Sequence, residues 1–233
     1  MTATATVPAL RAAGLVKKYG ARRVLEGIDL EVGPGAAVGL VGANGAGKTT
    51  FLKCVLDLCD CESGSVEIFG VPGRRAEARA RLAYVPERFV PPHYLLGREF
   101  LAMTAGLAGA PYEPGRAAAL ARELELDPQA LERPVRQLSK GMAQKLGLAG
   151  CFLLERDLYV LDEPMSGLDP AGRVAVKSLL ARLHGEGRAL FFTSHVLADV
   201  EELCSTITVL DRGTVRFRGA PAEIGRASCR ERV

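Results

Sequence analysis

The spacing of apolar and polar residues divides the chain into an alternating first part, a helical middle and an alternating last part. Strand patterns, separated by Gly20 and by the turn at 33–35, cover residues 10–19, 22–32, 36–42 and 64–70. The run 36–42 is almost entirely apolar, as a parallel strand buried on both faces requires. Helical spacing over 49–58 follows it directly.

From about Arg98 to Leu154 the apolar spacing is helical, with prolines interrupting it. Beyond this region, strand and helix patterns alternate over residues 158–162, 174–184, 189–194, 196–204, 206–211 and 214–219. The alternation predicts an α/β fold with a mostly parallel sheet, interrupted by a helical insertion. The last residues, 224–233, fit no pattern, and we interpret them as a truncated end or a foreign extension.

The composition is that of an ordinary globular protein. Its 233 residues are 48% hydrophobic and 24% charged, and the net charge of +3 gives no reason to expect a nucleic-acid partner. The sequence shows neither a secretory signal nor an uncharged apolar run of the roughly 18 residues that a membrane helix needs. We therefore expect a soluble or peripheral protein. The six cysteines have no C-x-x-C spacing, which favours free thiols in a reducing cytoplasm.

The stretch GANGAGKT at 42–49 matches the phosphate-binding pattern G-x-x-x-x-G-K-[ST] and lies between a strand pattern and a helix pattern. Glycines allow successive backbone N–H groups to surround phosphate oxygens, and the start of the helix adds partial positive charge. The lysine reaches the β- and γ-phosphates, and the threonine hydroxyl binds Mg²⁺. The predicted nucleotide-binding residues are Gly42, Asn44, Gly45, Ala46, Gly47, Lys48, Thr49 and Thr50.

The stretch LYVLDEP at 158–164 supplies two carboxylates at the end of a buried strand. Asp162 is placed to hold Mg²⁺, directly or through water, and Glu163 is placed to orient and deprotonate an attacking water. Alone, the two acids could simply begin a surface loop. Together with the phosphate loop they indicate that the chain binds a nucleoside triphosphate with Mg²⁺.

The order of GANGAGKTT, YVPE, LSKGM, LYVLDEP, SGLD and TSH resembles that of the ATP-binding cassette (ABC) ATPases, from Val7 to about Glu223. The resemblance implies an α/β fold: a P-loop NTPase core with a mostly parallel sheet, an N-terminal antiparallel β part and a helical signature subdomain. It implies one domain over 7–223, with the core at about 7–87 and 157–223 and the helical subdomain at about 88–156.

LSKGM at 138–142 resembles the family signature LSGGQ, with Lys140 and Met142 as departures. A serine that opens a helix is ordinarily its N-cap. In the family, two cassettes lie head to tail and each ATP is held between the phosphate loop of one and the signature helix of the other. The resemblance therefore implies that Ser139 and Gly141 contact the γ-phosphate of a partner's ATP. The K-G-M form is similar to that of bacterial multidrug and antibiotic exporter ATPases, which favours export.

Four further positions take roles from the same resemblance. Glu87 of YVPE stands where the family more often has glutamine, and it offers an oxygen toward Mg²⁺ or water, although it could be an ordinary loop carboxylate. His195 matches the switch histidine that contacts the γ-phosphate. Asp169 of SGLD matches the loop that couples the two cassettes. Tyr19 matches the aromatic residue that stacks on adenine, although it could serve strand packing alone.

The resemblance implies the ATP-binding and ATP-hydrolysing subunit of a transporter, with Glu163, His195 and Lys48 as catalytic residues. Its partners would be a second copy of the chain and separate transmembrane permease subunits, and its place would be cytoplasmic, on the inner face of the membrane. The alternative is a soluble ABC ATPase acting on ribosomes or DNA. A P-loop kinase or GTPase is disfavoured, because a GTPase would need a base-reading NKxD motif, which the sequence lacks.

Overall fold

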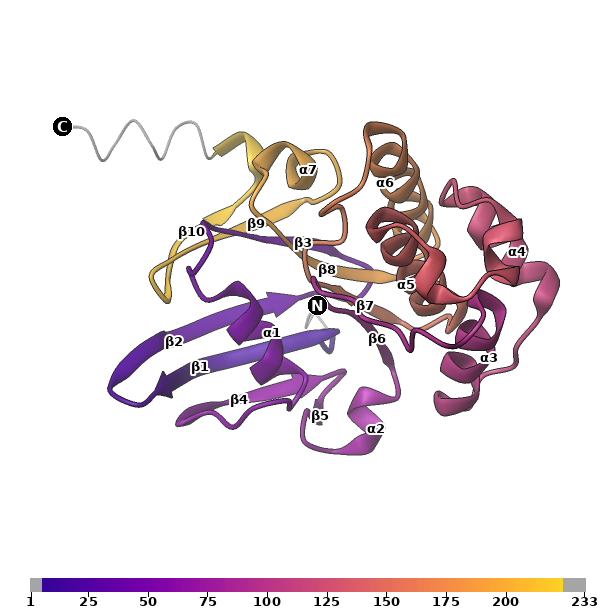
Figure 1. Cartoon of the computed structure of the whole chain (residues 1–233). Coiled ribbons are helices and arrows are strands. Elements are labelled where there is room, and N and C mark those ends of the chain that lie inside the picture. Colours follow the sequence, from indigo (N-terminus) through magenta and orange to yellow (C-terminus); the bar gives the residue numbers. More distant parts are fainter. Residues whose placement is uncertain (1–5, 224–233) are drawn as a thin grey trace.

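The computed structural model describes residues 6–223, and the fold of this part of the chain is built on two β-sheets (Figure 1). The smaller sheet is antiparallel, with the order β2-β1-β4-β5. Its strands are β1 (Leu10–Tyr19), β2 (Arg22–Val32), β4 (Ser63–Ile68) and β5 (Val71–Pro72). The turn between β1 and β2 is at Gly20, which has a positive φ of 59°, and both strands have the bounds that the sequence predicts.

The larger sheet has the order β10-β9-β3-β8-β7-β6 and is parallel except at its edge strand β10. Its strands are β3 (Ala37–Val41), β6 (Leu82–Val85), β7 (Leu158–Leu161), β8 (Ala189–Ser194), β9 (Thr206–Asp211) and β10 (Thr214–Gly219). The predicted α/β class, with an antiparallel N-terminal part and a mostly parallel sheet, is confirmed. Strand β6 is absent from the sequence prediction.

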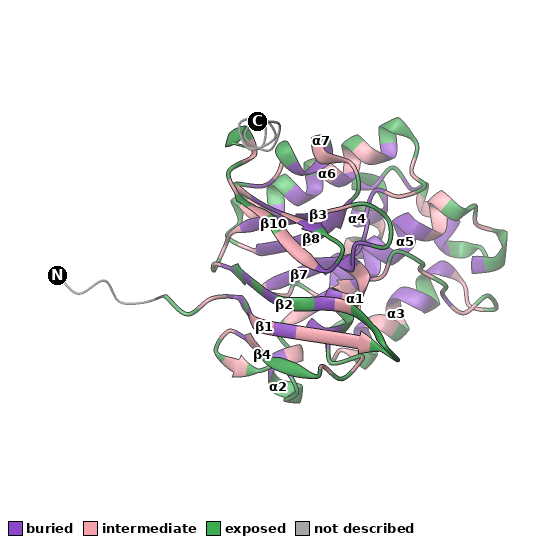
Figure 2. Cartoon of the chain, turned by 90° about the vertical axis from the view of Figure 1, so that its left-hand side faces the viewer, coloured by how far each residue is buried: buried purple, intermediate pink, exposed green. Residues whose placement is uncertain are grey.

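Helix α1 (Lys48–Val55) lies between the two sheets (Figure 1) and belongs to a core that both of them share, and Figure 2 shows the strands β3, β7 and β8 as buried. Its Phe51 has no exposed surface and meets Phe191 of β8 edge to face, with ring centroids 5.9 Å apart. The side chains of β7 alternate between two cores. Leu158 and Val160 belong to the core that contains α1, whereas Tyr159 belongs to the core on the opposite face of the sheet.

Helices cover that opposite face (Figure 1). They are α3 (Gly97–Leu107), α4 (Pro114–Glu123), α5 (Lys140–Leu153) and α6 (Pro170–Gly185), with two 3₁₀ turns, η1 (Pro128–Glu132) and η2 (Val135–Gln137), after α4. The short helices α2 (Ala76–Arg79) and α7 (Leu197–Glu201) complete the described chain. Helix α6 begins before its predicted start because Pro170 occupies its first turn, and α7 is shorter than the predicted 196–204.

Small residues on α5 determine how closely the helical region packs. A Cβ atom on Gly147 would lie 2.7 Å from the ring of Phe89, and one on Gly150 would lie 3.3 Å from that of Phe100. These two rings meet edge to face, with centroids 5.3 Å apart. Phe89 follows the predicted site residue Glu87 by two positions, so this packing anchors the segment that carries Glu87.

The sequence also led to expectations about membrane helices, disulfides and the C-terminal tail. No helix among the described residues is long and apolar enough to cross a membrane. The five cysteines between residues 6 and 223 are free, as the sequence predicts. The tail 224–233, with Cys229, lies outside the described residues, and the domain bounds near 7, 87, 157 and 223 stay predictions.

We expect Phe51→Ala to destabilise the fold by about 3–5 kcal/mol, because it removes a buried ring between two sheets that cannot both close on the cavity. Urea unfolding followed by circular dichroism measures the change. The control is Leu107→Ala, whose side chain is 82% exposed, and it should change stability by less than about 0.5 kcal/mol. Equal losses in the two variants would contradict the two-sided packing of α1.

Candidate nucleotide-binding site

Four neighbouring parallel strands end at one edge of the larger sheet, and a predicted site residue follows each of them. The strand order β3-β8-β7-β6 places the loop after Val41, His195, the Asp162–Glu163 pair and Glu87 along this edge. Ligands of open α/β sheets bind at the carboxyl ends of such strands. The fold therefore brings together groups that are far apart in the sequence.

Backbone geometry fixes the loop between β3 and α1. Gly45 and Gly47 have positive φ angles of 83° and 114°, and Gly47 directly precedes the first residue of α1. A Cβ atom on Gly42 would lie 2.4 Å from the carbonyl oxygen of Leu210, so only glycine fits there. The loop folds back tightly on the helix start, which is the shape of an anion-binding nest.

A cleft of about 450 Å³ opens over this loop. Of the predicted residues, Tyr19, Asn44, Gly45, Gly47, Lys48, Thr49, Thr50, Glu87 and Glu163 line it. Gly42 and Ala46 are not among its lining residues, since Gly42 packs against Leu210 and Ala46 is buried in the apolar core. Four further lining residues were not predicted from the sequence: Arg22, Val24, Ala43 and Arg88. Ala43 and Arg88 are next to predicted residues in the sequence. Arg22 and Val24 are on β2 and belong to no motif, so nothing in the sequence marks them.

Lys48 lies at the floor of the cleft and is 6% exposed. Its Nζ donates a hydrogen bond of 2.7 Å to the carbonyl oxygen of Gly42 and lies 3.3 Å from Oε1 of Glu163. The ammonium group is thus held against the loop and paired with a carboxylate. A phosphate group in the cleft would compete with Glu163 for this positive charge.

Asp162 is 1% exposed and only partly satisfied. The hydroxyl of Thr193 donates 2.7 Å to its Oδ1, whereas Oδ2 has no hydrogen-bond partner in the described structure. Burial raises the pKa of Asp162, and the nearby carboxylates Glu87 and Glu163 add to the rise, against the lowering effect of the Thr193 and Thr49 hydroxyls.

This environment fits a magnesium ion shared with phosphate. Mg²⁺ prefers oxygen ligands and is usually held by one or two protein groups together with phosphates and water. The unpartnered Oδ2 of Asp162 and the hydroxyl of Thr49 meet that need beside the cleft, with Glu87 on its wall. Among residues 6–223, no group of three or more His, Cys, Asp or Glu side chains could hold a metal alone.

Glu163 is fixed from three directions. Its backbone N–H donates 2.9 Å to Thr193 Oγ1, and its Oε2 lies 2.8 Å from Nδ1 of His195, while Lys48 faces its other oxygen. Its φ of 48° lies in the left-handed region, which a non-glycine residue adopts at a cost of roughly 1–3 kcal/mol. Such strain, in a side chain that is 7% exposed, is typical of a functional position.

Ser139, Gly141 and Asp169 do not line the cleft. Ser139 is exposed and caps α5, since its Oγ accepts a hydrogen bond of 3.2 Å from the N–H of Met142. A Cβ atom on Gly141 would lie 3.4 Å from the carbonyl oxygen of Gly167. Asp169, directly before α6, lies 3.6 Å from Lys145 Nζ. The signature residues thus open a helix outside the cleft of their own chain.

Comparisons with known proteins agree on one family. The family described as ABC transporter matches residues 25–166. An uncharacterized ABC transporter ATP-binding protein of Synechocystis sp. is 36% identical over 86% of this chain, and a second from Nostoc sp. is 36% identical. The chain spans 57% and 61% of these two relatives.

A relative named Nod factor export ATP-binding protein I, from Burkholderia pseudomallei, is 36% identical over 90% of this chain and 71% of its own length. Among solved structures, an ATP binding subunit of an ABC transporter is 31% identical with a TM-score of 0.87, and covers 97% of this chain and 95% of that one. A dimeric ATP-binding cassette bound to ADP and Pi has a TM-score of 0.83 at 20% identity over 91% of this chain and 98% of that one, which shows a shared fold.

We expect Asp162→Asn to stabilise the nucleotide-free protein at pH 7 by about 0.5–2 kcal/mol, because it removes a buried negative charge that lies near two other carboxylates. The folded-state pKa of Asp162 lies above the ordinary 3.8, so the folded state binds more protons than the unfolded state between these values. Stability contributed by this group therefore falls as pH rises through that window and stays low above it. The gain from asparagine should grow over the same window and then level off.

Thermal melts of both proteins without nucleotide, from pH 4 to pH 8, measure this difference. Asp60→Asn is the control, because the Asp60 side chain is 92% exposed and its substitution should leave stability unchanged. A variant that is no more stable than the parent at any pH would show that the buried carboxylate carries no cost.

Proposed function

The chain belongs to the ABC transporter family, and on that premise we propose that it binds Mg²⁺-ATP and hydrolyses it to drive transport through separate membrane subunits. One observation carries the proposal. The phosphate loop and Glu163 line a single cleft, with the buried Asp162 directly before Glu163, while the signature residues Ser139 and Gly141 lie outside it. The chain therefore presents a nucleotide site and, elsewhere, the helix start that would complete a second one.

Each group around the cleft has a task in water attack on the γ-phosphate. Glu163 would orient the water and accept its proton, and His195, at 2.8 Å, would hold that carboxylate in place. Lys48 would turn from Glu163 to the phosphate oxygens and stabilise the charge that develops on them. Mg²⁺, held by Thr49, Asp162 and Glu87, would supply further neutralisation of that charge.

The adenine end of the cleft is built by Tyr19. Its side chain is 50% exposed at the end of β1, so one face of the ring is free for stacking. Lys17 Nζ lies 5.1 Å from the ring centroid. Base stacking on an aromatic ring discriminates poorly between bases. We therefore propose that GTP is also accepted, although ATP is the expected substrate.

A second copy of the chain would complete the site. Helix α5 begins with exposed groups, where free N–H donors and the Ser139 hydroxyl suit a phosphate. By this proposal each copy covers the ATP of the other, and Asp169 lies in the loop that couples the two sites.

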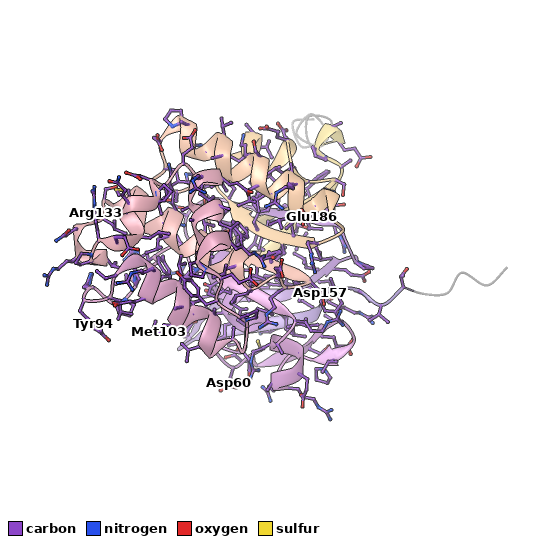
Figure 3. The ribbon with its side chains drawn as sticks, turned by 90° about the vertical axis from the view of Figure 1, so that its right-hand side faces the viewer. Asp60, Tyr94, Met103, Arg133, Asp157 and Glu186 are labelled. Carbon is purple, nitrogen blue, oxygen red and sulfur yellow. The ribbon has the colours of Figure 1, made fainter. Side chains whose placement is uncertain are left out.

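The segment after Glu87 offers a surface for the membrane subunits. Val90 and Tyr94 are 72% and 77% exposed, and Figure 3 shows Tyr94 projecting from the helical region. We place this surface, within the proposed helical subdomain 88–156, against the cytoplasmic side of the permease. The relative named for Nod factor export supports export as the direction. Nothing in the structure favours the alternative of a soluble ATPase acting on ribosomes or DNA.

We expect Glu163→Gln to reduce ATP turnover by about 10²–10⁴-fold, because glutamine cannot accept the proton of water. Binding of ATP should persist, and the unhydrolysed nucleotide should hold two copies together in size-exclusion chromatography. Lys48→Ala is the comparison, since it should lose both binding and turnover. A Glu163→Gln protein with full activity would remove this residue from the role of base.

We expect Ser139→Arg to prevent the ATP-dependent dimer while nucleotide still binds to the monomer, because the added side chain occupies the surface that would face a partner's phosphate. Combining it with Glu163→Gln allows both properties to be measured in one background, by chromatography and by equilibrium binding. Dimers that form as well as before would place the contact elsewhere.

A further inference from the structure

Three cysteines gather at the end of α1 and in the loop that follows it, and the proposed ATPase mechanism uses none of them. Cys54 is in the last turn of α1, and Cys59 and Cys61 are in the loop 56–62 that leads to β4. The sulfur atoms of Cys54 and Cys59 are 3.6 Å apart. All three side chains line a pocket of about 290 Å³, separate from the nucleotide cleft. Figure 3 shows Asp60, in the same loop, at the edge of the molecule.

The loop 56–62 is held by hydrogen bonds to β1, the strand that ends at Tyr19. Glu62 accepts a hydrogen bond of 2.7 Å from the N–H of Lys18 through Oε2, and its own N–H donates 2.9 Å to the carbonyl oxygen of Val16. Burial raises the pKa of Tyr19, and the Cys59 thiol adds to the rise. A displacement of Cys59 therefore acts on the residue proposed to stack on adenine.

We propose that Cys54 and Cys59 form a reversible disulfide in the presence of a hydroperoxide, and that this bond weakens nucleotide binding through Tyr19. The effect on binding rests on the proposed function, whereas the bond itself does not. The two sulfur atoms are already close and the Cys59 side chain is partly exposed, which suits thiol chemistry. Cytosolic disulfides are usually transient and redox-sensing, which suits such a pair.

The two thiols have different roles. Cys59 is partly exposed and would attack as the thiolate: an S–O bond forms, the O–O bond breaks, and an alcohol, or water from hydrogen peroxide, leaves. Cys54 is 5% exposed, and burial raises its pKa, with Cys61 and Cys59 adding to the rise, so it is the slower thiol and would resolve the sulfenic acid. An S–S bond then forms, the S–O bond breaks and water leaves. Two thiols are oxidised by two electrons, and one hydroperoxide is reduced.

The geometry gives the size of the movement that the bond requires. A disulfide has an S–S length of about 2.0 Å, so the two sulfur atoms must approach by roughly 1.5 Å. Cys54 is anchored in the buried face of α1, so Cys59 would make most of this movement. Its movement would pull on the loop 56–62, which Glu62 holds by hydrogen bonds to β1 just before Tyr19, and so would disturb the support that the ring needs for stacking.

Peptide mapping tests the bond. The full-length protein is treated with an equimolar amount of hydrogen peroxide, free thiols are blocked with iodoacetamide, and the chain is cut with trypsin and with a protease that cleaves before aspartate. Because Asp57 and Asp60 separate the three cysteines, each thiol falls in its own peptide. We expect a linked pair from Cys54 and Cys59. A Cys54–Cys61 link, or sulfinic acid without any link, would overturn the assignment.

Binding of a fluorescent ATP analogue tests the consequence. Peroxide should raise its Kd at least about fivefold, the lower limit for losing one aromatic–base stack, and dithiothreitol should restore it. Cys59→Ser should abolish the response, whereas the matched Cys61→Ser protein should keep it. A mapped Cys54–Cys59 bond with unchanged affinity would overturn the coupling to Tyr19. A reduced protein that binds no nucleotide would instead refute the proposed function, with the peptide map still deciding whether the bond forms.

Discussion

The balance of buried charge at the end of β7 is the constraint on which the rest of the site depends. Asp162 and Glu163 are adjacent and almost fully buried, and Lys48 is the cation in contact with Glu163. Burial of unpaired carboxylates is costly. Without nucleotide, the pairing at 3.3 Å relieves Glu163 but leaves one oxygen of Asp162 with no partner. The site is therefore under electrostatic strain that a bound cation would relieve.

The fold supports this arrangement through Thr193. Its hydroxyl donates to Asp162 and accepts from the N–H of Glu163, so one fully buried side chain on β8 positions both of the acids that follow β7. The strand itself is fixed by cores on both faces of the sheet, with Val160 on one side and Tyr159 on the other. Because β7 cannot shift without disturbing both cores, the carboxylates are held where the phosphate loop requires them.

Local signals explain what could be predicted from the sequence. The phosphate loop has a fixed spacing of glycines and lysine, and β1 and β2 have long alternating patterns around Gly20. Both features could therefore be predicted from the sequence. Strand β6 has four residues and no distinct pattern, and it exists because it pairs with β7. The role of Thr193 was hidden for a similar reason: a threonine in an apolar strand has no partner until the fold places β8 beside β7.

The remaining groups divide the proposed nucleotide site among separate elements. Tyr19 ends β1 and serves the adenine end, Lys48 opens α1 at the phosphates, and Ser139 caps α5 outside the cleft. By the proposed mechanism a single copy binds nucleotide through the first two elements, and the third reaches a phosphate only on another copy. Affinity and turnover thus respond to different parts of the chain. By the same proposals, a disulfide between Cys54 and Cys59 would alter how much nucleotide is held, while Glu163 and His195 would keep their geometry for the nucleotide that remains.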